Sequence, residues 1–101
     1  MKFMITAEPT AEAANRLDSQ PGGPGALFTE VAERYKPDAF YVHAGRRAAT
    51  WVLDLADGGA VAEVFHFMLA HTGATPTFVP VLSGREAAEE LPKAIARAHA
   101  R

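Results

Sequence analysis

The stretch AFYVHAGRRAATWVLDL, residues 39–55, decides the fold because it has the pattern of two strands joined by a turn. Runs of aromatic and β-branched residues flank the polar Gly45-Arg46-Arg47, which is typical of a β-hairpin. A lone hairpin is only marginally stable in water. These strands therefore need a larger sheet, a layer of helices and, we expect, a second chain.

Side chains alternate between two faces along a strand, and this divides the hairpin into two sets. If the turn closes symmetrically over residues 45–48, Val42 pairs with Trp51 and Phe40 pairs with Leu53. Those four residues share one face, and the opposite face carries Tyr41, His43, Thr50 and Val52. Both sets contain apolar side chains, which indicates a sheet that is covered on both sides.

The flanking sequence predicts the other elements. They are a strand over residues 2–6, helices over 11–18 and from 25 or 26 to 35, a helix from about 61, a strand over 77–82 and a final helix from about 84. The Pro- and Gly-rich residues 19–24 separate the first two helices, since neither residue type is stable inside a helix. Pro80 places the last strand at an edge or a bulge, and Pro92 is expected to interrupt the final helix.

Local signals also predict helix ends and buried stripes. The expected caps are Thr10, Asp57, Gly73 and the Ser83–Glu86 capping box. The expected inward stripes are Leu27, Phe28, Val31 and Tyr35 in one helix, and Val61, Val64, Phe65 and Met68 in the next. In that second helix, Phe67 is expected to point away from the stripe.

The order of these elements predicts one α+β domain over residues 1–101. It corresponds to a ferredoxin-like βαββαβ antiparallel sheet with helices on one face, followed by a C-terminal helix. The sheet face without helices must also be buried. A homodimer that packs sheet against sheet, forming an α+β barrel, does this most simply.

Composition excludes several classes of function. Ten Lys and Arg against twelve Asp and Glu give a net charge of −2, so no basic excess favours a nucleic acid partner. The chain has no cysteine, which excludes disulfides, a thiolate nucleophile and zinc–cysteine sites. No apolar run approaches the roughly 20 residues needed to span a bilayer, and residues 1–5 do not resemble a signal peptide. We expect a soluble cytoplasmic protein that does not bind membranes.

Four segments carry a resemblance to a known superfamily: residues 34–41 (RYKPDAFY), the Gly-Arg-Arg turn, residues 51–57 (WVLDLAD) and residues 77–82 (TFVPVL). The chain resembles small bacterial proteins of the dimeric α+β barrel superfamily, most of which have no assigned function. Its strand-helix-strand part is also similar to muconolactone isomerase and, more distantly, to antibiotic-biosynthesis monooxygenases.

The resemblance implies a fold, a homodimer and a pocket between the sheet and its helices. It also implies two kinds of site. Heme-degrading members use a histidine on a helix, whereas cofactor-independent oxygenases use Trp, Tyr, Asn and Arg. The Pro-Gly-Gly-Pro segment at residues 21–24 departs from the less interrupted first helix of these proteins. No motif transfers a role to a particular residue.

The predicted catalytic residues are Tyr41 and His43. A half-buried imidazole next to a phenol can move a proton near neutral pH, as isomerisation of an unsaturated lactone or ketone requires. The alternative is that His43 forms a hydrogen bond across a strand pair or a dimer interface.

The predicted substrate-binding residues are Arg46, Arg47, Trp51 and His66. The arginines can clamp a carboxylate or phosphate, or simply be solvated at the hairpin tip. Trp51 can stack on a planar ligand or belong to the core, and His66 can contact a ligand such as heme or lie on the surface. His66 and His71 lack the i, i+4 spacing of a helical metal pair, so we expect no metal site and no cofactor.

Three classes of function are consistent with the sequence. The first is a cofactor-independent enzyme, isomerase-like or monooxygenase-like, that acts on a small apolar or aromatic metabolite. The second is a dimer that binds a small hydrophobic ligand without chemistry. The third is a structural or accessory dimer whose cavity is filled by its own side chains. The sequence does not decide whether the protein is an enzyme.

Overall fold

The computed structural model describes residues 1–100 and contains a four-stranded sheet and four helices. The elements, in chain order, are β1 (Lys2–Ala7), α1 (Ala11–Ser19), α2 (Gly25–Tyr35), β2 (Ala39–Val42), β3 (Ala49–Asp54), α3 (Gly58–Thr72), β4 (Thr77–Val81) and α4 (Gly84–His99). Every predicted strand and helix is therefore present, with ends that differ from the prediction by a few residues at most. No helix within residues 1–100 is long and apolar enough to cross a membrane.

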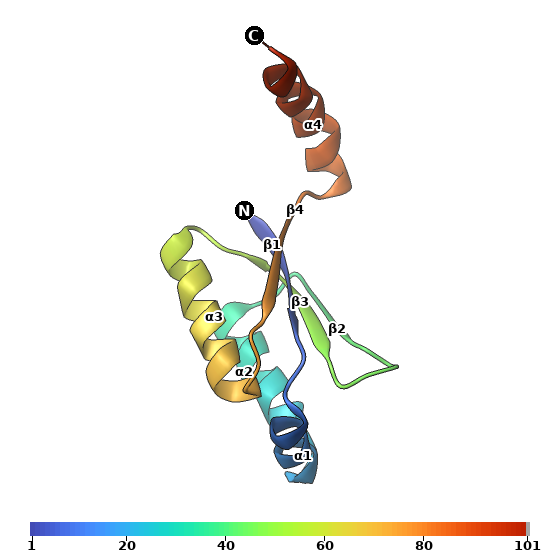
Figure 1. Cartoon of the computed structure of the whole chain (residues 1–101), viewed down its shortest axis with the longest axis vertical. Helices are drawn as coiled ribbons and strands as arrows, with labels where there is room; N and C mark the ends of the chain where they lie inside the picture. The colour runs from blue at the N-terminus through green and yellow to red at the C-terminus, as the bar shows by residue number, and fades with distance from the viewer. Residues whose placement is uncertain (101) are drawn as a thin grey trace.

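The strands form one sheet in the order β2-β3-β1-β4, and every neighbouring pair is antiparallel (Figure 1). This α+β arrangement is compatible with a ferredoxin-like fold. Strand β4 lies at an edge of the sheet, as the position of Pro80 predicted. Proline has no N–H group to offer a neighbouring strand, and an edge strand has a neighbour on one side only.

The hairpin has the predicted faces but not the predicted pairs. Phe40 pairs with Trp51 and Val42 pairs with Ala49, which is a shift of two residues from the expected register. The symmetric turn was wrong because the connection is longer: the His43 N–H donates to the Ala48 carbonyl oxygen, 2.9 Å away, so residues 44–47 form the turn. A shift of two leaves every side chain on its original face, since strands repeat with a period of two.

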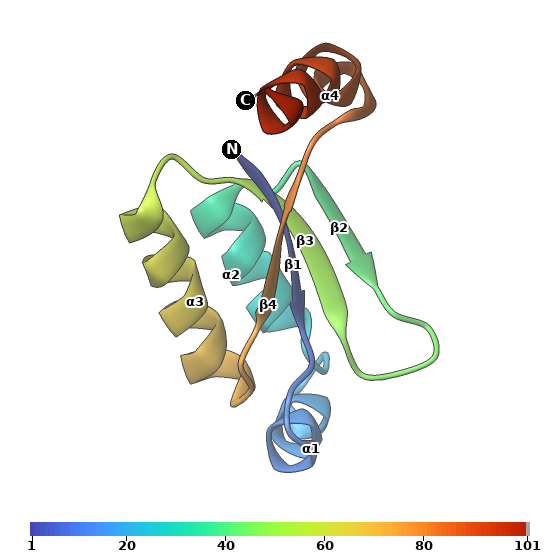
Figure 2. The ribbon, with the colours of Figure 1, turned by 45° about the horizontal axis from the view of Figure 1, so that its top comes forward.

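Helices α2 and α3 lie against one face of the sheet, which we call the covered face (Figures 1 and 2). Its central residues are Ile5, Trp51 and Leu53, which pack with Val31 of α2 and Val64 of α3. The other face, which we call the open face, is not covered by any helix of residues 1–100. Its residues include Lys2, Met4, Thr6, Tyr41, Thr50, Val52 and Val79.

The prediction for Phe67 was wrong. Phe67 is buried and packs edge-to-face on Tyr35 of α2, with 5.4 Å between ring centroids. The prediction assumed that α3 contacts the sheet alone, along a single narrow stripe. In the structure α3 also packs against α2, so its buried surface is wider than that stripe.

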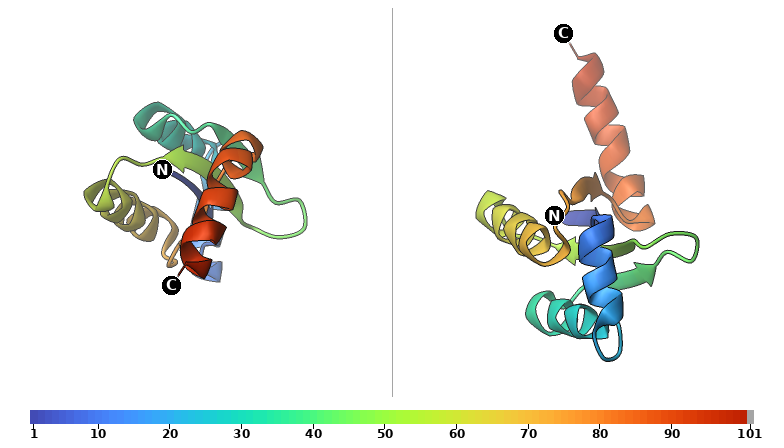
Figure 3. Two further views of the ribbon diagram at one scale, coloured as in Figure 1. Left: turned by 90° about the horizontal axis from the view of Figure 1, so that it is seen from above. Right: turned by 60° about the horizontal axis from the view of Figure 1, so that its bottom comes forward.

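The final helix is continuous through Pro92, whereas an interruption was expected. A proline inside a helix removes one backbone hydrogen bond and leaves a carbonyl without its partner. Helix α4 contains no buried residue, so water can reach that carbonyl. The helix begins beyond the end of β4 and projects away from the sheet (Figure 1, and from two further sides in Figure 3).

The predicted caps all form. Thr10 and Asp57 accept hydrogen bonds from backbone N–H groups three residues ahead, at 3.2 and 2.8 Å. Gly73 ends α3 in the left-handed conformation, with φ at 68°. Ser83 and Glu86 form both hydrogen bonds of the capping box, each 3.1 Å long. Local sequence therefore fixes where these helices begin and end.

Candidate functional site

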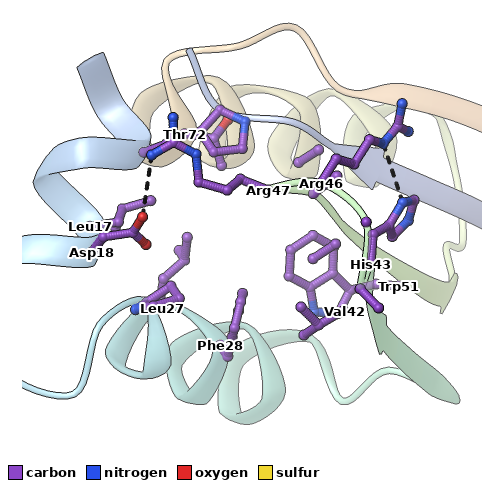
Figure 4. Close-up of a pocket in the computed structure, with 18 residues that line it drawn as sticks. Leu17, Asp18, Leu27, Phe28, Val42, His43, Arg46, Arg47, Trp51 and Thr72 are labelled. Atoms are coloured by element: carbon purple, nitrogen blue, oxygen red, sulfur yellow. Dashed lines mark hydrogen bonds and ion pairs between the residues drawn. The ribbon is translucent and has the colours of Figure 1, made fainter. Parts of the chain in front are cut away.

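A cavity of about 470 Å³ lies at one end of the covered face. Helices α1 and α2 form one side, and the 43–48 loop and the adjacent ends of β2 and β3 form the other (Figure 4). The walls are mostly apolar, with large side chains from Leu17, Leu27, Phe28, Val42 and Trp51. Five polar residues join this lining: Asp18, His43, Arg46, Arg47 and Thr72.

Small residues and a broken helix produce this space. Ala7, Ala14, Ala48 and Ala49 line the cavity with side chains of a single methyl group. The break at residues 20–24 lets α1 and α2 run in different directions, so that both contribute walls. Gly22 and Gly23 have φ values of 79° and 61°, a conformation that few residues other than glycine adopt readily. The departure from a long first helix thus creates part of the cavity wall.

Trp51 is both a core residue and a cavity residue, so the two interpretations offered by the sequence are not exclusive. It is buried and stacks on Phe40, with ring centroids 5.3 Å apart and planes 17° apart. Phe28 of α2 contacts it edge-on at 6.2 Å. These contacts hold the indole in one orientation, so Trp51 forms a rigid part of the cavity wall.

Arg47 connects the 43–48 loop to α1 (Figure 4). Its Nη1 donates to the Asn15 side-chain oxygen at 2.9 Å and lies 3.3 Å from an oxygen of Asp18. Both partners and Arg47 itself are exposed, so this ion pair contributes little stability. Its main effect is geometric, because it holds the guanidinium at the mouth of the cavity.

His43 begins a row of hydrogen bonds that runs onto the open face. Arg46 Nε lies 3.4 Å from His43 Nδ1, and His43 Nε2 lies 2.8 Å from Thr50 Oγ1. Thr50 Oγ1 lies 2.9 Å from Thr6 Oγ1 on the neighbouring strand. Arg46 can only donate, so His43 Nδ1 accepts and the ring proton of the neutral imidazole resides on Nε2. The Nε2–H group of the His43 ring then donates to Thr50 Oγ1, and the Thr50 hydroxyl can in turn donate to Thr6 Oγ1.

The structure brings four of the six predicted site residues together and leaves two apart. His43, Arg46, Arg47 and Trp51 all line the cavity. Tyr41 lies on the open face with 65% of its surface exposed and is not among the lining residues. His66 is exposed on α3, against the ring of Phe65, and is not among them either. Any role for Tyr41 or His66 in this cavity would need a rearrangement or a second chain.

The sequence analysis did not identify which residues of α1 and α2 line the cavity. Leu17, Asp18, Leu27 and Phe28 were assigned to helices, but nothing linked them to a site. A signal was present in the clustering of small residues in the segments around this end of the sheet. Alanines opposite large apolar residues leave space in a packed layer.

Tyr35 has the most unusual titratable group of the core. Its hydroxyl is buried between α2 and α3 and has no hydrogen-bond partner within residues 1–100. Burial raises the pKa of this phenol above its ordinary value of 10.0, and the nearby Glu63 carboxylate raises the pKa further. The group does not line the 470 Å³ cavity, so it is a feature of the core and not of the candidate site.

No group of three or more His, Asp or Glu side chains within residues 1–100 is arranged to hold a metal ion. The polar side chains at the cavity are two guanidiniums, an imidazole, a carboxylate and a hydroxyl, which suit hydrogen bonding to an organic ligand. Comparisons with protein-family models, curated proteins and solved structures find no match to this chain. The functional argument therefore rests on the cavity.

Proposed function

We propose that this protein binds a small, largely apolar molecule in the 470 Å³ cavity, without a resident cofactor. The volume carries the proposal, because ligand pockets in proteins usually enclose about 300 to 1,000 Å³. Apolar walls with a few polar groups at one side are the usual composition of such pockets. The open space favours a ligand-binding protein over a purely structural dimer whose side chains fill the interior.

The rim of the cavity defines the polar part of the ligand. Arg46 and Arg47 carry two positive charges, and Asp18 carries one negative charge. Asp18 already has an arginine partner, whereas Arg46 is only loosely paired with Glu8, at 3.8 Å. An aromatic or alicyclic body with one carboxylate or similar anionic group therefore matches the walls and the rim.

The proposed assembly is a homodimer of the α+β barrel type. The open face supports this, because an antiparallel sheet with apolar side chains on both faces is most stable when both are covered. Two copies related by a two-fold axis cover both open faces at once, using the same surface twice.

The binding proposal can be tested by fluorescence because Trp51 is the only tryptophan in the chain and lines the cavity. We expect 8-anilinonaphthalene-1-sulfonate, an aromatic anion, to quench Trp51 emission and to saturate. The Ala14→Leu substitution fills the cavity and should weaken this saturable quenching about tenfold or more. Ala62→Leu, the same substitution at an exposed position of α3 outside the cavity, is the matched control and should leave it unchanged.

Two outcomes would argue against a ligand cavity. One is that Trp51 emission does not respond to the probe. The other is that Ala14→Leu and the parent chain give the same saturation curve while both remain folded by circular dichroism. Native mass spectrometry of the purified protein provides an independent check, because a bound molecule adds a defined mass.

The hydrogen bonds of His43 favour a second candidate function, proton transfer to or from the bound molecule. With the ring proton on Nε2 and held by Thr50, Nδ1 is the atom free to act as a base once Arg46 turns to a ligand anion. The bond from Arg46 is long, so a ligand can replace it. This candidate uses His43 alone among the predicted catalytic pair.

Deuterium exchange tests this candidate. The molecule released from purified protein is identified by mass spectrometry and then incubated with the protein in D₂O. We expect the parent chain to exchange a C–H hydrogen of that molecule, and His43→Gln to lose the exchange. Arg16→Gln, on the exposed side of α1, is the control. Equal exchange in the parent chain and His43→Gln would exclude His43 as the base.

A further inference from the structure

The accessible surface area of the chain is larger than that expected for a compact monomer of its mass. Its accessible surface is 6620 Å², which is about 1,100 Å² above the roughly 5,500 Å² expected for a folded monomer of this mass. Its radius of gyration is 16.2 Å, against about 13 Å for a compact chain of this length. A standard protein interface buries about 800 Å² on each partner, so the excess is enough for one side of a stable dimer.

Helix α4 supplies much of this excess. It has no buried residue, yet its sequence places apolar or small residues along one side, as in a helix that packs on something. That side consists of Gly84, Ala87, Ala88, Leu91, Ala94, Ile95 and Ala98. Leu91 and Ile95 are 48% and 56% exposed. The remaining surface of the helix is mostly charged, so the apolar stripe has one clear direction.

The open face of the sheet is the matching surface. Met4 and Val79 are neighbours across the β1–β4 pair and are 40% and 41% exposed. Val52 lies beside Met4 across the β1–β3 pair. These three side chains form an apolar strip across the middle of the open face, and no element of the same chain lies on it. A helix with an apolar stripe is a common cover for such a face.

The short connection keeps α4 from its own open face. Only Leu82 and Ser83 separate β4 from α4. Both hydrogen bonds of the capping box join Ser83 to the first turn of α4, and the helix projects away from the sheet (Figure 3). A return of α4 onto the open face of its own chain would require a reversal of direction within Leu82 and Ser83.

We propose that α4 packs its Leu91–Ile95 stripe on the open face of a second copy of this chain, and that the second copy returns the same contact. A single copy offers both halves of the contact, the helix and the sheet face, in equal number. A two-fold pair satisfies both halves and closes, whereas a different partner would have to supply both surfaces itself. The inference rests on the proposed homodimer but changes its contact: α4 of each copy, and not the partner's sheet, covers the Met4–Val52–Val79 strip.

Engineered cysteines test this contact directly, because the chain has none of its own. One batch carries Ile95→Cys, and a second batch with a size tag carries Val79→Cys. After the batches are mixed under mild oxidation, we expect a disulfide between an untagged and a tagged chain. Arg97→Cys, on the charged side of α4, replaces Ile95→Cys in the control mixture and should give several-fold less cross-link.

Charge substitutions test the same contact without chemical trapping. Leu91→Glu and Ile95→Glu should each weaken dimerisation about tenfold or more, since each places a charge in an apolar contact. Ala96→Glu adds the same charge on the opposite side of α4 and should leave the dimer unchanged. None of these residues is buried within one chain, so circular dichroism should show folded protein in every case.

The outcomes separate this inference from the proposed homodimer. A full-length chain that is monomeric at micromolar concentration, by light scattering, contradicts both. A dimer that withstands Leu91→Glu and Ile95→Glu, or that cross-links Val79→Cys to Val79→Cys alone, retains the homodimer and overturns the role of α4. A disulfide within a single chain that carries both Ile95→Cys and Val79→Cys shows that α4 covers the sheet of its own chain. That result also overturns the proposed role of α4.

Discussion

The two faces of the sheet come from the same strands, yet they differ in completeness. On the covered face, Ile5 is fully buried beneath α2 and α3. On the open face, its chain neighbour Met4 is apolar as well but remains 40% exposed. The covered face packs against helices and forms a core that extends to the cavity. The open face has exposed apolar side chains. Because side chains alternate along each strand, the sheet has two faces with apolar residues. The helices of one chain cover only one of these faces.

The largest expected effect contrasts these two neighbours. Ile5→Ala should lower the free energy of unfolding by about 2–5 kcal/mol, because it opens a void in a close-packed core. Met4→Ala should lower it by less than about 1 kcal/mol at low protein concentration, where the open face is bare. Urea unfolding followed by circular dichroism measures both values.

Protein concentration sharpens this contrast. If a second copy covers the open face, the effect of Met4→Ala should grow as the protein concentration rises, since dimerisation adds to stability by mass action. The effect of Ile5→Ala should stay large at every concentration. Equal effects of the two substitutions at low concentration would show that the faces do not differ as described.

A smaller effect is expected from the hydrogen-bonded row on the open face. Thr50→Val keeps the shape of a buried side chain but removes the hydroxyl that joins His43 to Thr6. We expect a loss of about 1 kcal/mol in the free energy of unfolding, as for a typical hydrogen bond within a protein. Thr77→Val, exposed at the end of β4, is the control, and a loss as large as that of Thr50→Val would refute a special role for the row.

The two arginines of the loop should differ in a subtler way. Arg47→Met removes the contacts with Asn15 and Asp18, so the backbone amides of α1 should exchange hydrogen faster. Arg46→Met should not change this exchange, because its partners are Glu8, which follows β1, and His43 in its own loop. Global stability should change by less than about 1 kcal/mol in both variants. Identical exchange in α1 for the two variants would show that Arg47 does not hold this helix.

The smallest effect at neutral pH is expected for Tyr35→Phe. The Tyr35 hydroxyl is buried and has no hydrogen-bond partner among residues 1–100, so its removal should leave stability unchanged or slightly increased. The pKa of Tyr35 is higher in the folded chain than its ordinary value of 10.0. The parent chain should therefore lose stability as the pH rises above 10, and the variant should lose less. A parent and a variant with the same alkaline profile would mean that this phenol does not titrate differently on folding.

The sequence predicted those parts of the fold that depend on local chemistry. The caps at Thr10, Asp57 and Ser83 and the two faces of the hairpin follow from side-chain hydrogen bonding and from the two-residue period of a strand. The paired residues of the hairpin did not follow, because the residue types at positions 43–48 are consistent with more than one turn length, and each length gives a different register. Phe67 was misplaced for a similar reason, since its burial requires α2.

The candidate site was predicted only where it lies on the hairpin. His43, Arg46, Arg47 and Trp51 were found because their residue types stand out beside a turn. The walls from α1 and α2 consist of Leu, Phe and Ala, which look the same in a cavity as in a core. Whether such residues leave space depends on how three elements meet in three dimensions, and a one-dimensional pattern does not contain that information.

Native mass spectrometry tests the central claim most directly, because it reports the number of subunits and the bound molecule together. The two unequal faces lead us to expect a species of twice the 10.8 kDa chain mass that carries additional small-molecule mass. Denaturation should release that mass and leave single chains. A bare 10.8 kDa species at micromolar concentration would contradict both the covered open face and the occupied cavity.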